Sequence, residues 1–189
     1  MQSDLVQCAG RESVGEAIES GSSLSQNERG ILQGTMLTVD HSLPPTSGHA
    51  LARVHAIEER MRACSAKAPE THVEHVLHAG MYARTIRCKG GQAFASVTIR
   101  PGTILIVNGW ASITNGDYVL EIKGYKVIPA SAGRKAIWLI REDTEITAIF
   151  PTEARTIAAA EAEFTTEPEK LSELTENDLV VITGEPCLA

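Results

Sequence analysis

The feature that most constrains this chain is a series of short runs in which apolar and polar residues alternate, separated by turn residues. The runs are MYARTIR, QAFASVTIR, TILIVNG, WASIT, YVLEI, YKVIP, AIWLIR and TEITAIF, between residues 81 and 150. Asn115-Gly116 stands between two of them, and this pair is a strong hairpin signal. Strands at this spacing, with no long helix between them, predict a mainly β fold: an antiparallel sandwich or small barrel over residues 71–152. The glycines between runs, Gly109 and Gly124 among them, are interpreted as turns.

The residues before this segment predict an arm, 1–70, that contains one or two short helices. Ser25 and Glu28 have the spacing of a capping box, but glycines follow soon after. A better helix is expected from about Gly48 to Ala66, where Thr46 or Ser47 could cap its start. Its apolar residues recur at near-helical spacing: Leu51, Val54, Ile57 and Met61. The narrow stripe could dock on the β-domain, pair with a copy of itself or contact a partner protein, and docking is favoured.

Residues 153–189 predict an acidic helix at AEAEF and then a strand at DLVVIT, Asp178 to Thr183. The β-branched content of the second run is typical of a strand. We expect it to add an edge strand to the barrel or to pair with another subunit. The acidic residues from Glu161 to Glu176 are interpreted as a solvated surface.

Composition argues against several classes of protein. A net charge of -7 argues against a general nucleic-acid surface, which needs clustered Lys and Arg. No apolar run reaches the length of a membrane span, and the first residues lack the pattern of a secretory signal. The four cysteines form no CxxC pair and are interpreted as reduced thiols. These observations predict a protein that is neither secreted by a signal peptide nor transmembrane.

Three longer runs resemble a known family. HVLHAGMYARTIR, ILIVNGWASITNGDYVLEIKGYKVIPASAGRK and EDTEITAIFPTEARTIAAAEAEFT are similar to small cupin-like (jelly-roll) proteins of tailed bacteriophages and prophages. The resemblance covers about Val76 to Thr165, and GYKVIPASAGRKAIWLI is its most specific part. Most of that family has no assigned function, so the resemblance implies a phage setting and a β-barrel more than it implies chemistry. It also implies a location in the virion or the host cytoplasm.

The residues do not predict the metal site of a cupin enzyme, which usually needs a cluster of histidines. Between Val107 and Tyr118, where the early ligands are expected, there is no histidine, and Arg134 and Lys135 occupy the later position. We therefore expect no metal and no other cofactor. A remaining group is interpreted as a surface or loop cluster, because a strand would point its two closest histidines, three residues apart, to opposite faces. Its members are His72, Glu74, His75 and His78.

A second group of residues is cationic and could hold an anion at the barrel mouth. Tyr82 and Arg84 share one face of their strand by alternation. If Arg84 points inward it needs a partner such as Glu121, Glu145 or a ligand, and the alternative is an outward, solvated arginine. The candidate ligand-binding residues are His78, Tyr82, Arg84, Asn108, Arg134 and Lys135.

Three hypotheses for the function follow. The first is a non-catalytic, virion-associated or assembly accessory protein that forms a homo-oligomer and contacts other phage structural proteins. The second is a module that binds a small anionic ligand, such as a nucleotide or sugar phosphate, and in a phage setting could sequester a host defence signal. The third is a metal-independent isomerase or lyase with His78 as base and Tyr82 as acid. No catalytic residue is assigned, because no nucleophile motif is present.

Overall fold

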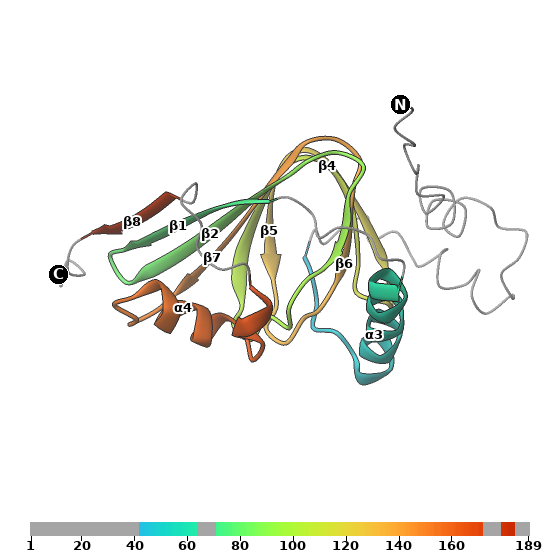
Figure 1. Cartoon of the computed structure of the whole chain (residues 1–189), viewed down its shortest axis with the longest axis horizontal. Coiled ribbons are helices and arrows are strands. Elements are labelled where there is room, and N and C mark those ends of the chain that lie inside the picture. Colours follow the sequence, from blue (N-terminus) through green and yellow to red (C-terminus); the bar gives the residue numbers. More distant parts are fainter. Residues whose placement is uncertain (1–41, 64–70, 172–178, 184–189) are drawn as a thin grey trace, which may run out of the picture.

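The computed structural model describes residues 42–63, 71–171 and 179–183. The elements, labelled as in Figure 1, follow one another in this order: α3 (Gly48–Ala63), β1 (His72–His78), β2 (Met81–Cys88), β3 (Ala93–Ala95), β4 (Thr103–Thr114), β5 (Val119–Ala130), β6 (Ile137–Ile140), β7 (Thr144–Pro151), α4 (Ile157–Phe164), the short 3₁₀ helix η1 (Pro168–Lys170) and β8 (Leu179–Thr183). None of the helices in this part of the chain is long and apolar enough to cross a membrane.

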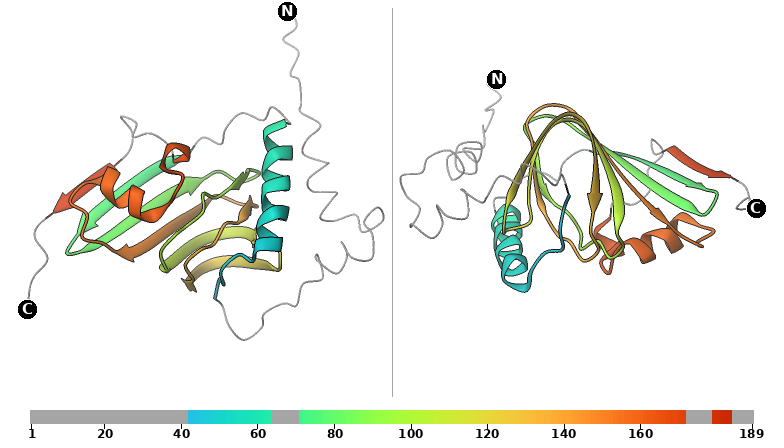
Figure 2. Two further views of the ribbon diagram at one scale, coloured as in Figure 1. Left: turned by 90° about the horizontal axis from the view of Figure 1, so that it is seen from below. Right: turned by 180° about the vertical axis from the view of Figure 1, so that it is seen from behind.

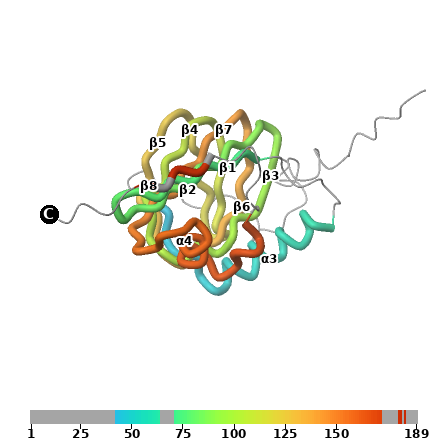
Figure 3. Tube along the Cα trace, turned by 60° about the vertical axis from the view of Figure 1, so that its left-hand side comes forward, coloured from blue at the N-terminus to red at the C-terminus, as the bar shows by residue number. Residues whose placement is uncertain are grey.

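The strands form one curled, eight-stranded sheet with the order β3-β6-β4-β7-β2-β1-β8, and β5 pairs with β4. The sheet arches over an interior that α3 and α4 border on opposite flanks (Figures 1 and 2). The trace winds around this interior, as Figure 3 shows from another side. The expected mainly β, antiparallel and jelly-roll-like fold is therefore confirmed.

The longest hairpin joins β4 to β5 and differs from the expected pattern. Its turn at Asn115–Gly116 is confirmed, but TILIVNG and WASIT are one strand, and so are YVLEI and YKVIP. Gly109 and Gly124 are paired with each other inside these strands. Their interpretation as turns between strands was wrong.

Gly109 lies where β4 changes partner. Residues 104–108 of β4 pair with β7, and residues 111–114 pair with β6. The β6–β7 turn is inserted at this point, and the backbone N–H groups of Arg141 and Glu142 donate to the Trp110 carbonyl at 2.8 and 3.2 Å. Gly109 has φ = 144°, and a β-carbon there would lie 2.4 Å from Thr144 Oγ1. Only glycine suits this backbone conformation and this close approach.

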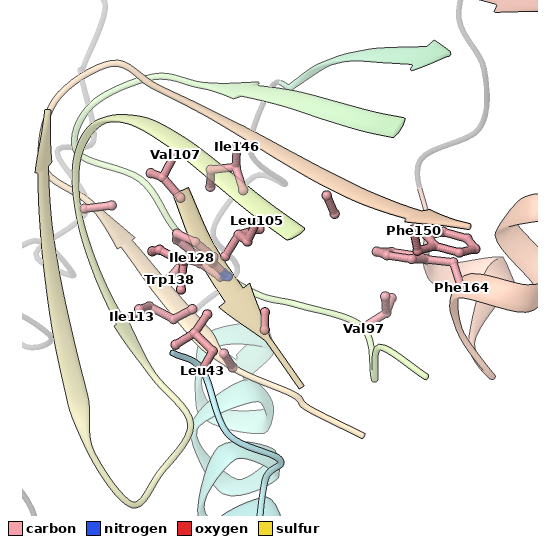
Figure 4. Close-up of a cluster of buried hydrophobic side chains, with 14 of the residues drawn as sticks. Leu43, Val97, Leu105, Val107, Ile113, Ile128, Trp138, Ile146, Phe150 and Phe164 are labelled. Carbon is pink, nitrogen blue, oxygen red and sulfur yellow. The ribbon is translucent and has the colours of Figure 1, made fainter. Parts of the chain in front are cut away.

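The core lies inside the arch and is aliphatic apart from a few aromatic rings. Alternation along β4 turns Leu105, Val107 and Ile113 inward, and they pack with Ile128 of β5 and Ile146 of β7. Figure 4 shows this cluster with Trp138, and shows Phe150 beside Phe164 of α4. These two phenyl rings are stacked with centroids 5.6 Å apart, so the pair attaches α4 to the sheet.

Helix α3 docks on the sheet, as expected. Ser47 Oγ accepts the Ala50 N–H at 3.2 Å and so caps the helix. Arg53 makes an ion pair of 2.6 Å with Asp117 in the β4–β5 turn. Val54, the most buried residue of the predicted stripe, has no exposed surface. The helix contacts β3 and β6 with this face.

The remaining segments confirm the sequence-based expectations only in part. Helix α4 forms at AEAEF, and Thr156 caps it. The predicted C-terminal strand is β8, which extends the sheet by parallel pairing with β1. The run 92–100 is a strand only at Ala93–Ala95, because its later part makes only isolated bridges through Ile99. The helix expected near Ser25 lies outside the described residues.

Candidate functional site

Beneath the arch lies a cavity of about 300 Å³, the lower end of the range typical of small-molecule sites. Most of its lining is apolar, including Leu105, Ile113, Trp138, Ile146, Ala148 and Phe164. Polar side chains border it at a few positions: Arg84, Ser96, Asn115, Tyr118, Arg134, Lys170 and Thr71. Lys170 is exposed, so the cavity opens beside η1.

Arg84 is one of three cationic side chains that line the cavity, with Arg134 and Lys170. Tyr82 and Arg84 share a face of β2, as predicted, and that face is the inner one, with exposed fractions of 0% and 9%. The Arg84 Nε lies 3.5 Å from Glu161 Oε1 of α4, an ion pair with a residue other than the partners expected, Glu121 and Glu145. No hydrogen bond joins this guanidinium to another described residue, and only its Nε is fully enclosed without one. Arg84 is among the residues that line the cavity.

Glu161 corrects the interpretation of the acidic run as a solvated surface. Its side chain is 16% exposed, because α4 presses it against β2. Burial raises the pKa of Glu161, and the nearby Arg84 charge lowers it by a smaller amount. The carboxylate is thus an incomplete partner for Arg84: close enough to pair, but without a hydrogen bond and poorly solvated.

The His75 side chain corrects a second interpretation. His75 lies in β1 and not in a loop, is fully buried, and its Nδ1 lies 2.8 Å from the hydroxyl of Tyr82. Burial and the Glu161 charge raise the pKa of Tyr82, while the Arg84 charge lowers it. This buried pair does not line the cavity.

Two of the candidate ligand residues lie on the outside of the sheet. His78 is exposed at the end of β1, and its Nδ1 lies 2.6 Å from Thr183 Oγ1 of β8. Asn108 is exposed because it alternates with the buried Val107. The structure therefore does not bring His78 or Asn108 to the cavity, and His78 does not contact Tyr82 as the base of an acid–base pair would.

Arg134 is a buried cation that borders the cavity and supports the surrounding loops. Its guanidinium donates to the carbonyls of Ala130 and Ser131 at 3.3 and 2.8 Å, and to Thr103 Oγ1 at 2.5 Å. Burial lowers the pKa of Arg134 to about 10. None of the ion pairs within the described residues includes Arg134, and the acceptors that it contacts there are neutral oxygens.

Lys135 is engaged elsewhere. It is 1% exposed and does not line the cavity; its Nζ lies 3.2 Å from Glu58 of α3 and 3.5 Å from Glu167 beside η1, and donates to the Ser96 carbonyl. Lys170 pairs with the same two carboxylates. This network joins α3 to η1 near the opening of the cavity.

Asn115 and Tyr118 are cavity residues that the sequence reasoning did not propose as ligand contacts. Asn115 Oδ1 accepts the backbone N–H groups of Asp117 and Tyr118 at 3.0 and 3.3 Å, which closes the β4–β5 turn. Asn115 Nδ2 and the Tyr118 hydroxyl are both enclosed without a hydrogen-bond partner among the described residues. Burial raises the pKa of Tyr118, and the Arg134 charge lowers it. The Asn115-Gly116 motif indicated the turn, but nothing in the pattern indicated which atoms would border a cavity.

The described residues contain no group of three or more His, Cys, Asp or Glu side chains that could hold a metal ion. The cavity instead combines apolar walls with two guanidinium groups, one ammonium group, one amide, one phenol and two aliphatic hydroxyl groups. Such a site can hold a molecule that has an apolar body and acidic or carbonyl groups.

No protein-family model and no curated protein matches this chain. Among solved structures it is similar to an RmlC-like cupin with a double-stranded β-helix fold from Methanocaldococcus jannaschii: identity is 14%, the match covers 46% of this chain and 84% of the other, and the TM-score is 0.38. A cupin-2 domain protein from Shewanella frigidimarina is 16% identical, with coverages of 52% and 97% and a TM-score of 0.33. The cupin-2 domain of an XRE family transcriptional regulator from Enterobacter cloacae is 12% identical, with coverages of 43% and 97% and a TM-score of 0.36.

Proposed function

We propose that this protein binds a small acidic molecule, a carboxylate or a phosphate with an apolar body, in the cavity beneath the arch. The observation that carries the proposal is Arg84, a buried guanidinium that borders the cavity without a hydrogen bond to any described residue. Lys135, which the sequence also suggested for this role, is neutralised by Glu58 and Glu167 and is not part of the proposed site.

The energetics of burial support this function. A cation enclosed in an apolar site is costly unless it is paired and hydrogen-bonded. Glu161 supplies charge at 3.5 Å but no hydrogen bond. An incoming carboxylate or phosphate could accept two parallel N–H bonds from the planar guanidinium, a geometry that arginine favours. The apolar walls would contact the rest of the molecule.

The test is calorimetric titration of octanoate and phenyl phosphate into the full chain, with octanamide as the uncharged comparison. Arg84→Leu should weaken binding of the acids by roughly tenfold to a hundredfold, the range for a hydrogen bond to a charged group. Arg84→Lys should bind with intermediate affinity, because it keeps the charge but not the planar fork.

The matched control is Arg87→Leu. Arg87 is in the same strand but points outward, where it is 46% exposed and pairs with Glu74 and Glu145. This variant should bind the acids like the wild type. The proposal fails if neither acid binds the wild type, or if Arg84→Leu binds as tightly as Arg87→Leu while both are folded by circular dichroism.

A second candidate is a self-associating accessory protein of a virion, and one observation favours the self-association. Ile104, Tyr125 and Val127 are 50%, 64% and 51% exposed on the outer surface of the β4–β5 hairpin. Among the described residues, the outer edge of β5 pairs only near its end, where Ala130 bridges to Leu43. A second copy of the chain could cover both the apolar side chains and the edge.

Light scattering after size-exclusion chromatography tests self-association. Tyr125→Glu should shift a multimer toward the monomer, whereas Met81→Glu, at a 38% exposed apolar residue on β2, should not. A wild-type monomer at high concentration contradicts this candidate, and the virion role would then lose its support.

A further inference from the structure

Asn115 and Tyr118 form a second polar part of the cavity, apart from Arg84, and indicate a second polar group on the ligand. This inference rests on the proposed function, because it concerns the same cavity. Asn115 and Tyr118 belong to the β4–β5 turn, three strands away from Arg84 along the sheet order β5-β4-β7-β2. The two polar ends therefore come from different parts of the fold.

The orientation of the Asn115 amide follows from the turn. Because Asn115 Oδ1 accepts two backbone N–H groups, its other end, Nδ2, is held away from the turn backbone. Asn115 is 3% exposed, lines the cavity, and its Nδ2 donates to no described residue. A buried amide group without an acceptor is rare in proteins and indicates a missing partner.

The Tyr118 hydroxyl has the same character. It is enclosed, it makes no hydrogen bond within the described residues, and its ring also lines the cavity. Arg134 borders the same cavity, and its charge acts on Tyr118. Arg134 uses its own N–H groups on carbonyls and on Thr103, so it contributes positive charge more than free donors.

A donor amide, a donor hydroxyl and an uncompensated positive charge together favour an anionic acceptor. We propose that the ligand is a two-headed acid: one acidic group binds Arg84, and a second carboxylate accepts hydrogen bonds from Asn115 and Tyr118 near Arg134. The apolar walls between these ends contact the connecting chain.

The test compares the affinity of straight-chain diacids, from succinate to sebacate, with that of monoacids of equal length, by calorimetry on the full chain. The wild type should prefer one diacid by at least about tenfold over its monoacid, the effect expected when a buried donor gains a hydrogen-bond partner. Tyr118→Phe should bring the ratio of diacid affinity to monoacid affinity close to one. Tyr125→Phe, at the exposed tyrosine of β5, is the matched control and should keep it.

Asn115→Asp is the second variant. It retains the oxygen that closes the turn but replaces the donor with a carboxylate. The diacid should therefore lose more affinity than the monoacid of equal length. Tyr118→Phe should also be at least as stable as the wild type without ligand, because it removes a hydroxyl that lacks a partner.

The outcomes separate the two proposals. If monoacids bind through Arg84 but no diacid is preferred, or if Tyr118→Phe keeps the preference, the two-headed ligand is refuted and the acid-binding function stands. If no acid binds the wild type, the proposed function itself is refuted.

Discussion

Replacing Gly109 with alanine tests whether the close packing at Gly109, where β4 changes its pairing partner from β7 to β6, determines the stability of the curled sheet. The new β-carbon would lie 2.4 Å from Thr144 Oγ1, 2.7 Å from the Asp143 carbonyl oxygen and 2.7 Å from Thr144 Cα. Two of these atoms belong to the backbone of the β6–β7 turn, which the Trp110 carbonyl holds in place. The turn therefore cannot move away without breaking its own hydrogen bonds.

Two contributions to the loss of stability can be separated. The backbone at φ = 144° suits glycine alone, and holding another residue in such a region costs about 1–3 kcal/mol. Forcing a methyl group into a filled space costs a further 1–3 kcal/mol, roughly. The expected loss is about 4 kcal/mol, a large fraction of the roughly 5–15 kcal/mol that stabilises a typical domain.

Gly124→Ala is the matched control, since Gly124 faces Gly109 in the register. It also has a positive φ, 75°, but an added β-carbon would meet nothing within 4 Å. This variant should lose only the backbone contribution, about 1 kcal/mol, because an alanine in the left-handed region is strained but not crowded.

Urea unfolding followed by circular dichroism measures both variants. With a slope of about 2 kcal/mol per molar, Gly109→Ala should lower the midpoint by about 2 M and Gly124→Ala by about 0.5 M. Equal midpoints for the two variants would show that the β6–β7 turn does not press on Gly109. The explanation that crowding by this turn requires glycine at position 109 would then be wrong.

Three further predictions concern other parts of the fold. Burial raises the pKa of Cys88 to about 11. In a variant whose other three cysteines are replaced by serine, Cys88 should react with a disulfide reagent at pH 8 on the order of a hundredfold more slowly in the folded protein than in urea. Equal rates in the two conditions would contradict this. Burial acts to raise the pKa of Glu167, but hydrogen bonds from Lys170 and Thr98 and the Lys135 charge outweigh it and lower that pKa to about 2. The stabilising contribution of Glu167 is complete above its unfolded pKa near 4.5 and is lost as the pH falls toward 2. Between these pH values Glu167→Gln should therefore lose less stability than the wild type. Urea midpoints that fall equally with pH in both proteins would refute this. Ser47→Ala removes the cap of α3 and should lower the free energy of unfolding by about 1 kcal/mol, and an unchanged urea midpoint would argue against the cap.

Local patterns predicted the strands and the facing of their side chains, because alternation and turn chemistry act over a few residues. Tyr82 and Arg84 were correctly placed on one face, and the Asn115-Gly116 turn was correctly identified. Which face is the inner one depends on how β2 pairs with β7, across more than fifty positions of sequence. Local patterns carry no information about that register.

The same limit explains the site residues that were misplaced or missed. His75 and His78 had to point to opposite faces, but only the curled sheet decides that His75 is the buried one. Glu161 reaches Arg84 from a helix that lies far along the chain, so no spacing connects them. Gly109 stands between two alternating runs, as a turn glycine does in sequence. Its role inside β4 becomes clear only from the close approach of Thr144.

The pairing of β8 with β1 has a consequence for how quickly the chain folds. Glu74 and Leu179 are neighbours in the sheet although more than one hundred positions separate them in sequence. Bringing such distant segments together demands a large loss of chain entropy before any contact compensates for it, and proteins rich in such contacts fold slowly. The β1–β2 hairpin is local and can form early, with the far edge of β1 unpaired until β8 arrives. During that interval β1 is open to another chain, so refolding yield should fall as protein concentration rises.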